Sequence, residues 1–294
     1  MLARKTKSDI VFDIANYAFL GFFTIMILYP LYFIVIASVS DPDRIFTGDV
    51  WLWPSGLTFD GYRRIFNDPA IWIGYRNSIL YAAVSAVIST VLVIMAAYPV
   101  SRKDFLGRNA FMTFFVITLF FNGGIIPTYL LIKQLHLIDT MWAVVLPSAV
   151  DAFLIIIAKT FFQELPGELR EAAAIDGCRN IKYLLSIVLP LSKPIIAVLV
   201  LFAVVRQWNG FFDALIYLND GDKFPLQLVL RNILIQSQPS GNLVNDIDTL
   251  LAKQRVTELI KFGVIIVAAL PLLILYPFLQ RFFVKGVMVG SVKG

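Results

Sequence analysis

Long runs of apolar residues, separated by shorter polar segments, dominate the chain. A helix that crosses a bilayer needs about 20 mostly apolar residues. Several stretches reach this length with no charged residue, and others contain only one or two charges. The pattern predicts an all-α integral membrane protein that forms a single domain over residues 1–294. We expect six transmembrane helices, at 14–38, 77–100, 109–132, 140–162, 183–205 and 262–280.

The distribution of Lys and Arg predicts an orientation, because cytoplasmic loops carry an excess of these residues near the ends of spans. With the N-terminus inside, the inner segments hold 14 cations against seven acids, and the outer segments hold 11 cations against 12 acids. An even number of spans then places the C-terminus inside as well. The first apolar run is longer than the core of a signal peptide, so we expect an uncleaved anchor.

Composition supports a membrane protein and excludes several functions. The chain is 59% apolar and 15% charged, with a mean hydropathy of +0.78, whereas an ordinary soluble domain is about a quarter charged. Neither disorder nor a nucleic-acid-binding arm fits this composition. One Cys and one His exclude an internal disulfide and a multi-His metal site. No phosphate-binding loop or hydrolase motif occurs, so we expect no catalytic site, cofactor or ATP on this chain.

The inner loop 163–186 has the pattern of two short helices that meet at a glycine. Pro166 suits the first turn of a helix, and Gly177 can end that helix in a left-handed conformation. A second helix is expected from Asn180 toward Pro190. The two small residues Ala172 and Ala173 would let another protein approach the backbone closely. The loop is therefore predicted to be a bent, protruding docking element.

The spacing within this loop resembles the EAA motif of ABC importer membrane subunits. Glu171-Ala172-Ala173 is followed after three residues by Gly177, and after nine more by Ile187, then Leu189-Pro190. The resemblance implies that this loop couples the chain to separate ATPase subunits. The residues to which it assigns that role are Glu171, Ala172, Ala173, Asp176, Gly177, Ile187, Leu189 and Pro190.

Other segments resemble the MalG-type permease subunits of sugar importers. Residues 206–218 are similar to the Trp-Asn-x-Phe signature of that branch, although Ala214 stands where the family often has proline. Residues 280–286 and 292–294 resemble the MalG-type tail, and 29–32 and 36–42 resemble an LplC-like subgroup associated with complex oligosaccharides. The likeness covers nearly the whole chain.

This resemblance implies the type I importer permease fold in the cytoplasmic membrane. It also implies a heterodimer with a second permease subunit, two cytoplasmic ATPase subunits that carry ATP and Mg, an extracellular solute-binding protein and an oligosaccharide substrate. The outer loop 206–261 is long enough to fold and contact an extracellular partner. Within it, 226–235 has a pattern that fits a helix or a strand, and 243–251 has a helical apolar face.

Five residues are candidates for the substrate path. Asp151 lies near the middle of the fourth predicted span, about 17 Å deep in a continuous helix. An acid there is costly, and it either contacts sugar hydroxyls or holds a neighbouring helix. Asn122 and Tyr129 flank a predicted break in the third span, which forms a cavity wall or a close helix contact through glycines. Trp208 and Asn209 are expected near the outer mouth of the cavity.

An ion-gradient-driven secondary transporter is the alternative function. It needs coupling charges within the bundle, and only Asp151 is placed deep. It would usually show two similar halves, and none is visible. A membrane enzyme has no nucleophile–base pair to support it.

The outer segment 41–76 is rich in aromatic residues. We expect its rings to anchor the chain at the membrane interface, where the apolar ring and the polar N–H or O–H are both accommodated. The residues concerned are Trp51, Trp53, Tyr62, Trp72 and Tyr75.

Overall fold

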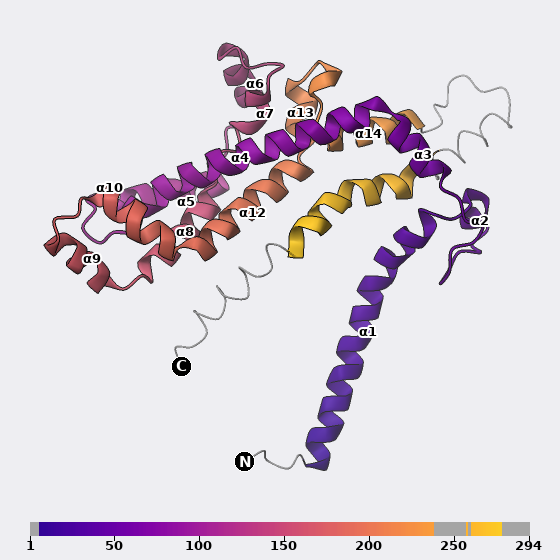
Figure 1. Cartoon of the computed structure of the whole chain (residues 1–294), viewed down its shortest axis with the longest axis horizontal. Coiled ribbons are helices and arrows are strands. Elements are labelled where there is room, and N and C mark those ends of the chain that lie inside the picture. The colour runs from indigo at the N-terminus through magenta and orange to yellow at the C-terminus, as the bar shows by residue number, and fades with distance from the viewer. Residues whose placement is uncertain (1–5, 238–256, 258–259, 278–294) are drawn as a thin grey trace. The chain divides into compact units, whose positions relative to one another are not determined.

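The computed structural model describes residues 6–237, 257 and 260–277, and all regular secondary structure within them is helical (Figure 1). The predicted all-α class is confirmed for this part of the chain. The first helices are α1 (Lys7–Ala37), α2 (Pro42–Phe46), α3 (Asp60–Asn67), α4 (Pro69–Ser101), α5 (Arg108–Phe120), α6 (Ile125–Gln134) and α7 (Met141–Val145). They are followed by α8 (Ala152–Gln163), α9 (Gly167–Ile175), α10 (Asn180–Tyr183), the π-helical turn η1 (Leu184–Val188), α11 (Leu189–Leu191), α12 (Lys193–Asn209), α13 (Phe212–Tyr217), the short 3-10 helix η2 (Gly221–Lys223), α14 (Leu226–Ser237) and an unlabelled helix Ile260–Pro277.

Three described helices are long and apolar enough to cross a membrane alone: α1, α4 and Ile260–Pro277. Two further candidates are bent pairs, α5 with α6 at 111° and the segment Asn180–Leu191 with α12 at 83°. The described residues therefore supply three to five candidate spans by length and composition.

The interval 140–162 differs from a continuous span. It contains two helices, α7 and α8, separated by the non-helical residues 146–151. Pro147 lies in this break, and Asp151 is the N-cap residue of α8. The depth of about 17 Å expected for Asp151 was calculated with a rise of 1.5 Å per residue along one unbroken helix. Because the helix is broken before Asp151, that depth is wrong.

The chain divides into two compact units, of residues 1–68 with 232–269 and of residues 69–231 with 270–294. In the first unit, α1 begins with a capping box in which the Thr6 hydroxyl accepts from the Asp9 N–H and the Asp9 carboxylate accepts from the Thr6 N–H. Nearly all of α1 is exposed. Its Phe33 meets Phe262 edge to face, with ring centroids 6.0 Å apart.

In the second unit, α8 and α12 both pack along α4 (Figure 1). Ala97 of α4 and Ala158 of α8 are fully buried in the shared core. Small residues at such contacts let the backbones approach, and close packing is what holds helices together in lipid. The other fully or almost fully buried residues of this core are Val93, Leu154, Ile155, Val188 and Leu199.

The N-terminal part of α4 is covered by residues 214–230. The Asn77 amide donates to the carbonyls of Asp222 and Phe224, and the Ser78 hydroxyl accepts from the Leu226 N–H at 2.8 Å. The described part of loop 206–261 is therefore folded, and 226–235 is helix rather than strand. The predicted apolar face at 243–251 and the tail segments 280–286 and 292–294 lie outside the described residues.

The turn between α6 and α7 is tied to the same region through Asp139. Its carboxylate accepts from the N–H groups of Asn219 and Asp220 and lies 2.7 Å from the Lys223 Nζ. These contacts, the lysine first, lower the pKa of Asp139 to about 2. Asp139 itself has a left-handed backbone, with a φ of 59°.

Candidate functional site

The predicted docking element consists of α9 and the helical segment Asn180–Leu191. Helix α9 ends as predicted, because Gly177 has a φ of 69°. The Cys178 N–H bonds to the Ala173 carbonyl at 2.9 Å, and the Gly177 N–H bonds to the Ala174 carbonyl at 3.0 Å. This pair of bonds is a Schellman motif, which satisfies carbonyls that a helix end leaves without partners. The next helix starts at Asn180, so the predicted bend is confirmed.

The residues of the EAA-like pattern divide into two groups by burial. Ala173 is 7% exposed and belongs to the core with Leu154 and Tyr183, and Ile187 and Leu189 pack against the same core. In contrast, Glu171, Ala172, Asp176, Gly177 and Pro190 are exposed. The expectation that both alanines form one docking surface is wrong, because Ala173 is covered by this chain itself.

The docking element is joined to the end of α4 by a cluster of charges. The Asp104 carboxylate lies 2.7 Å from Nη2 of both Arg102 and Arg170. Arg102 also donates to the Asn180 side chain. Hydrogen bonds from Arg102 and then Arg170 hold the pKa of Asp104 well below its usual range. Sequence analysis missed this cluster, because nothing in the spacing of residues 104 and 170 indicates that they meet.

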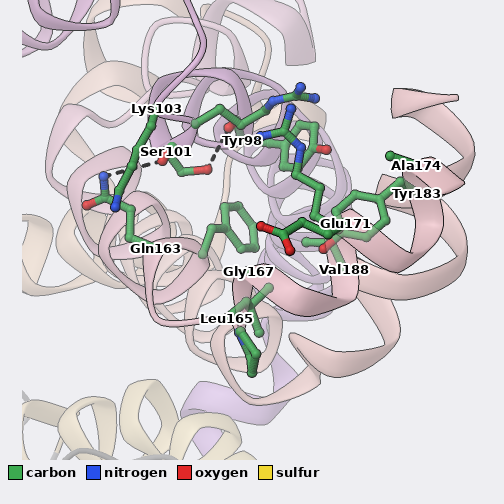
Figure 2. A pocket seen from close by; sticks show the side chains of 14 residues that line it. Tyr98, Ser101, Lys103, Gln163, Leu165, Gly167, Glu171, Ala174, Tyr183 and Val188 are labelled. Atoms are coloured by element: carbon green, nitrogen blue, oxygen red, sulfur yellow. Dashed lines mark hydrogen bonds between the residues drawn. The ribbon is translucent and has the colours of Figure 1, made fainter. Parts of the chain in front are cut away.

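A hollow of about 530 Å³ lies between the end of α4, the α8–α9 turn and α9 (Figure 2). Figure 2 shows the Glu171 carboxylate directed into it, opposite Gln163, whose amide donates to the Ser101 carbonyl at 3.3 Å. Within the described residues, the Glu171 side chain makes no hydrogen bond or ion pair. An acid at the rim of an open hollow can accept hydrogen bonds from a partner without first breaking a contact of its own.

A second hollow, of about 310 Å³, lies where the α5–α6 and α7–α8 breaks meet α6 and α13. Asn122 lines it, and its side-chain oxygen accepts from the Gly124 N–H at 3.0 Å across the α5–α6 break. Tyr129 stacks on Tyr217, which also lines the hollow, with ring centroids 6.2 Å apart. The other lining residues are Gly124, Ile125, Thr128, Pro147, Ser148, Phe212, Asp213 and Ile216.

Asp213 is a lining residue that sequence analysis did not single out. Burial raises the pKa of its carboxyl. Together with Asn122, Thr128 and Ser148, it gives this hollow several hydrogen-bonding groups and no Lys or Arg in the described lining. Hydroxyl groups, which donate as well as accept, suit such a surface.

Asp151 has a partner on a neighbouring helix. Its Oδ2 lies 2.7 Å from Nη1 of Arg206 in α12, and its Oδ1 accepts from the Phe153 and Leu154 N–H groups at the start of α8. Arg206 also donates to the Ser148 carbonyl. Both Asp151 oxygens are therefore engaged, which supports the reading that this acid holds helices together. Arg206 was not predicted as its partner, because α12 extends to Asn209, past the predicted span end at 205.

Trp208 and Asn209 do not line the 310 Å³ hollow. Trp208 is 4% exposed, and its ring centroid is 6.2 Å from that of Tyr75 in α4. The Asn209 amide donates to the Val205 carbonyl at 3.0 Å. The structure thus places Asn122 at the hollow and Tyr129 behind it, and Trp208 and Asn209 elsewhere.

Comparisons with known proteins agree with the resemblance in the motifs. Residues 70–289 match the family model described as "Binding-protein-dependent transport system inner membrane component". The chain is 40% identical to the protein LplC of Bacillus subtilis (strain 168) over 99% of this chain and 97% of that protein. It is 38% identical to the polygalacturonan/rhamnogalacturonan transport system permease protein YtcP of the same organism, over 97% and 99% of the two chains. A solved bacterial ABC transporter involved in import of the acidic polysaccharide alginate contains a chain with a TM-score of 0.82 and 30% identity, covering 95% of this chain and 99% of that one.

Proposed function

The chain belongs to the family of binding-protein-dependent transport system inner membrane components, and from that premise we propose how it works within a sugar importer. It is a permease component of a sugar ABC transporter and a multi-pass protein of the cytoplasmic membrane. We propose that it passes an oligosaccharide by alternating access and that ATP is bound and hydrolysed by separate subunits.

The proposed coupling route is the docking element formed by α9 and the segment Asn180–Leu191. The observation that carries this proposal is the division of the EAA-like pattern into buried and exposed positions. Ala173, Ile187 and Leu189 attach the element to the core of α4, α8 and α12. Glu171 and Ala172 remain available to an ATPase subunit. A displacement of the element would therefore move the spans that follow and precede it.

The proposed assembly has a second permease subunit, two cytoplasmic ATPases and an extracellular binding protein. Only a contact that differs between the inward-open and outward-open states can shift their populations. We propose that closure of the ATPases supplies that difference at Glu171, Ala172 and Gly177. The ion-gradient alternative depended on Asp151 as a deep coupling charge, and that acid is paired with Arg206.

Substitution of Gly177 by Val tests the coupling route. A residue with a side chain is strained at a φ of 69°, by about 1–2 kcal/mol, and a β-branched residue is strained further. We expect the complex to assemble with its partner permease and to lose sugar-stimulated ATP hydrolysis or its ATPase subunits. Gly167→Val is the matched control, because Gly167 also lies on α9 with open space around it and without a positive φ. Normal coupled hydrolysis by assembled Gly177→Val would defeat the proposal.

We further propose six spans with both termini in the cytoplasm. Support comes from the charge distribution and from the five candidate spans of the described residues, counting each bent pair as one span. The broken interval 140–162 would be the sixth span. In a Cys178→Ser background, a membrane-impermeant thiol reagent added outside should modify Gly221→Cys and spare Gly167→Cys. Both glycines have open space around them, so access to the reagent is the variable. Modification of Gly167→Cys but not of Gly221→Cys would show that the orientation is the reverse of the one proposed.

The proposed substrate site is the 310 Å³ hollow. Its Asn, Thr, Ser and acid groups suit sugar hydroxyls. The relatives named above include one for a polygalacturonan or rhamnogalacturonan, and another, 31% identical, is the arabinooligosaccharide permease AraQ of Halalkalibacterium halodurans. Uptake of neutral and uronate-containing oligosaccharides by the reconstituted importer, compared side by side, identifies which class is carried.

A further inference from the structure

The segment that follows α1 turns back along that helix. Three backbone N–H groups hold the segment in this position. The Thr58 N–H donates to the Val39 carbonyl, the Asp41 N–H to the Ser55 carbonyl, and the Ser55 N–H to the Ser40 hydroxyl. Figure 1 shows the resulting loop beside the C-terminal end of α1, near the label of α2. The chain therefore returns toward the first span before it continues to α3.

The tip of this loop is Trp51-Leu52-Trp53, and two tyrosines of α1 hold it. The Tyr29 hydroxyl donates to the Trp51 carbonyl at 3.3 Å, and the Tyr32 hydroxyl donates to the Leu52 carbonyl. The Trp51 indole N–H donates to the Gly48 carbonyl at 2.5 Å. These bonds satisfy polar groups of the tip and fix its position along the helix.

The position of the two tyrosines gives the depth of the tip. Tyr29 and Tyr32 precede the end of α1 at Ala37 by eight and five residues, about 12 and 8 Å along the helix axis. The full 31-residue helix is about 46 Å long, whereas the hydrocarbon core of a bilayer is about 30 Å thick. From Asp13, the last charge of α1, to Tyr32 is about 28 Å. A hydrocarbon core of about 30 Å that begins just after Asp13 would end near Tyr32, and the last turn of α1 would extend past it.

The tip is strongly apolar on its exposed side. Trp51, Leu52 and Trp53 are 69%, 61% and 78% exposed, while Val50 beside them is buried. The charged residues of the loop, Asp41, Asp43, Arg44 and Asp49, come before the tip rather than within it. Exposed Trp residues beside Tyr residues are typical of a membrane interface, where indole and phenol rings are enriched.

We propose that Trp51-Leu52-Trp53 is an interfacial anchor that inserts among lipid headgroups at the C-terminal end of α1 and sets the depth of the first span. The proposal rests on the membrane location of the chain and on α1, and not on the transport mechanism. The proposal does not include Trp72. That residue lies on α4, and its ring centroid is 6.2 Å from that of Tyr75.

The test uses the assembled importer in phosphatidylcholine vesicles whose acyl chains carry bromine near the headgroup end or near the methyl end. The fluorescence of the tip is obtained by difference, as the tryptophan fluorescence of the unaltered importer minus that of the double variant Trp51→Phe with Trp53→Phe. We expect lipid brominated near the headgroup to quench this contribution at least about twofold more than lipid brominated near the methyl end. Trp72→Phe is the control for loss of one exposed tryptophan outside the tip.

Three results would overturn the proposal. Quenching by aqueous iodide without quenching by either lipid would place the tip in water. Protection from both quenchers would place a protein partner over it, and stronger quenching from the methyl end would place it deep in the hydrocarbon. A second variant, Tyr29→Phe with Tyr32→Phe, removes only the two hydroxyls. It should reduce the headgroup-end quenching of Trp51 and Trp53, and unchanged quenching would show that the two hydroxyls do not tie the tip to α1, so that the tip does not set the depth of the first span.

Discussion

The docking element and the 310 Å³ hollow are both built from interrupted helices, yet they are assembled in different ways. The docking element is continuous in sequence: Glu171, Gly177 and Pro190 lie within 20 residues, and a local Schellman motif makes its bend. The hollow collects residues from 122–128, 147–148 and 212–217, which only the packing of the second unit brings together. A local site can be identified from residue spacing, whereas a site of distant segments needs the fold.

The largest effect is expected at the ion pair beside the hollow. Asp151→Asn preserves the N-cap acceptor, since Asn caps helices as well as Asp, but it leaves the Arg206 charge without its partner. Removing one member of a buried pair costs about 3–5 kcal/mol, and we expect less than this because these side chains are 27% and 33% exposed. Thermal unfolding of the solubilised complex should show a clear loss of stability.

The control for this prediction is the double variant Asp151→Asn with Arg206→Gln, which restores a neutral pair. It should recover much of the lost stability. If Asp151→Asn instead abolishes uptake without lowering the unfolding temperature, Asp151 acts on the substrate and the helix-holding reading fails.

The second effect separates the two alanines of the EAA-like pattern. Ala173→Leu inserts methylene groups into a closed core, which costs about 1–3 kcal/mol. Ala172→Leu adds the same side chain at an exposed position, so it should leave the unfolding temperature unchanged and weaken copurification of the ATPase. Equal loss of stability in both variants would contradict the division into buried and exposed positions.

A smaller effect is expected within the hollow. Asn122→Ala removes a lining amide and should raise the KM for uptake by about fivefold, corresponding to one hydrogen bond of about 1 kcal/mol. Asn209→Ala is the matched control, because Asn209 does not line the hollow. Measurements of initial uptake rates against sugar concentration distinguish them, and a larger effect at Asn209 would place the substrate elsewhere.

The smallest effect is a pH dependence at the turn that carries Asp139. Its pKa is lowered in the folded chain to about 2, so its contribution to stability is complete above the unfolded pKa of about 3.9 and is lost as pH falls through about 2. Asp139→Asn keeps a residue type that tolerates the left-handed backbone and should flatten this dependence. Unfolding temperatures at pH 5 and pH 3 test it, and identical slopes in both proteins would exclude Asp139 as the cause.

Sequence reasoning succeeded where the signal is local and failed where partners are distant. The apolar run at 77–100 lies within α4, and the run at 14–38 lies within α1 except for its last residue, the C-cap Ser38. The breaks at Gly124 and Gly177 follow from the positive φ that glycine accepts. The pairing of Asp151 with Arg206 joins residues 55 positions apart, and no spacing rule connects them.

The break before α8 was foreseeable from residues already in view. Pro147 disfavours a continuing helix, and Asp at 151 is a preferred N-cap residue. The interval 140–162 was nevertheless predicted as one continuous span, because its apolar composition was given more weight than these two residues. An acid inside an apolar run should be considered as the start of a helix before it is considered as a charge in the middle of one.

The Asp151–Arg206 pair has a mechanical consequence, because of where α8 and α12 lie in the chain. Both helices lead to the docking element at one end, through Gln163 and Lys193. At the other end, the pair fastens the start of α8 to the last turn of α12. The peptide chain and the ion pair thus form a closed frame braced along α4. A closed frame resists separation of its members, so under the proposed coupling route a displacement of α9 would move α8 and α12 together.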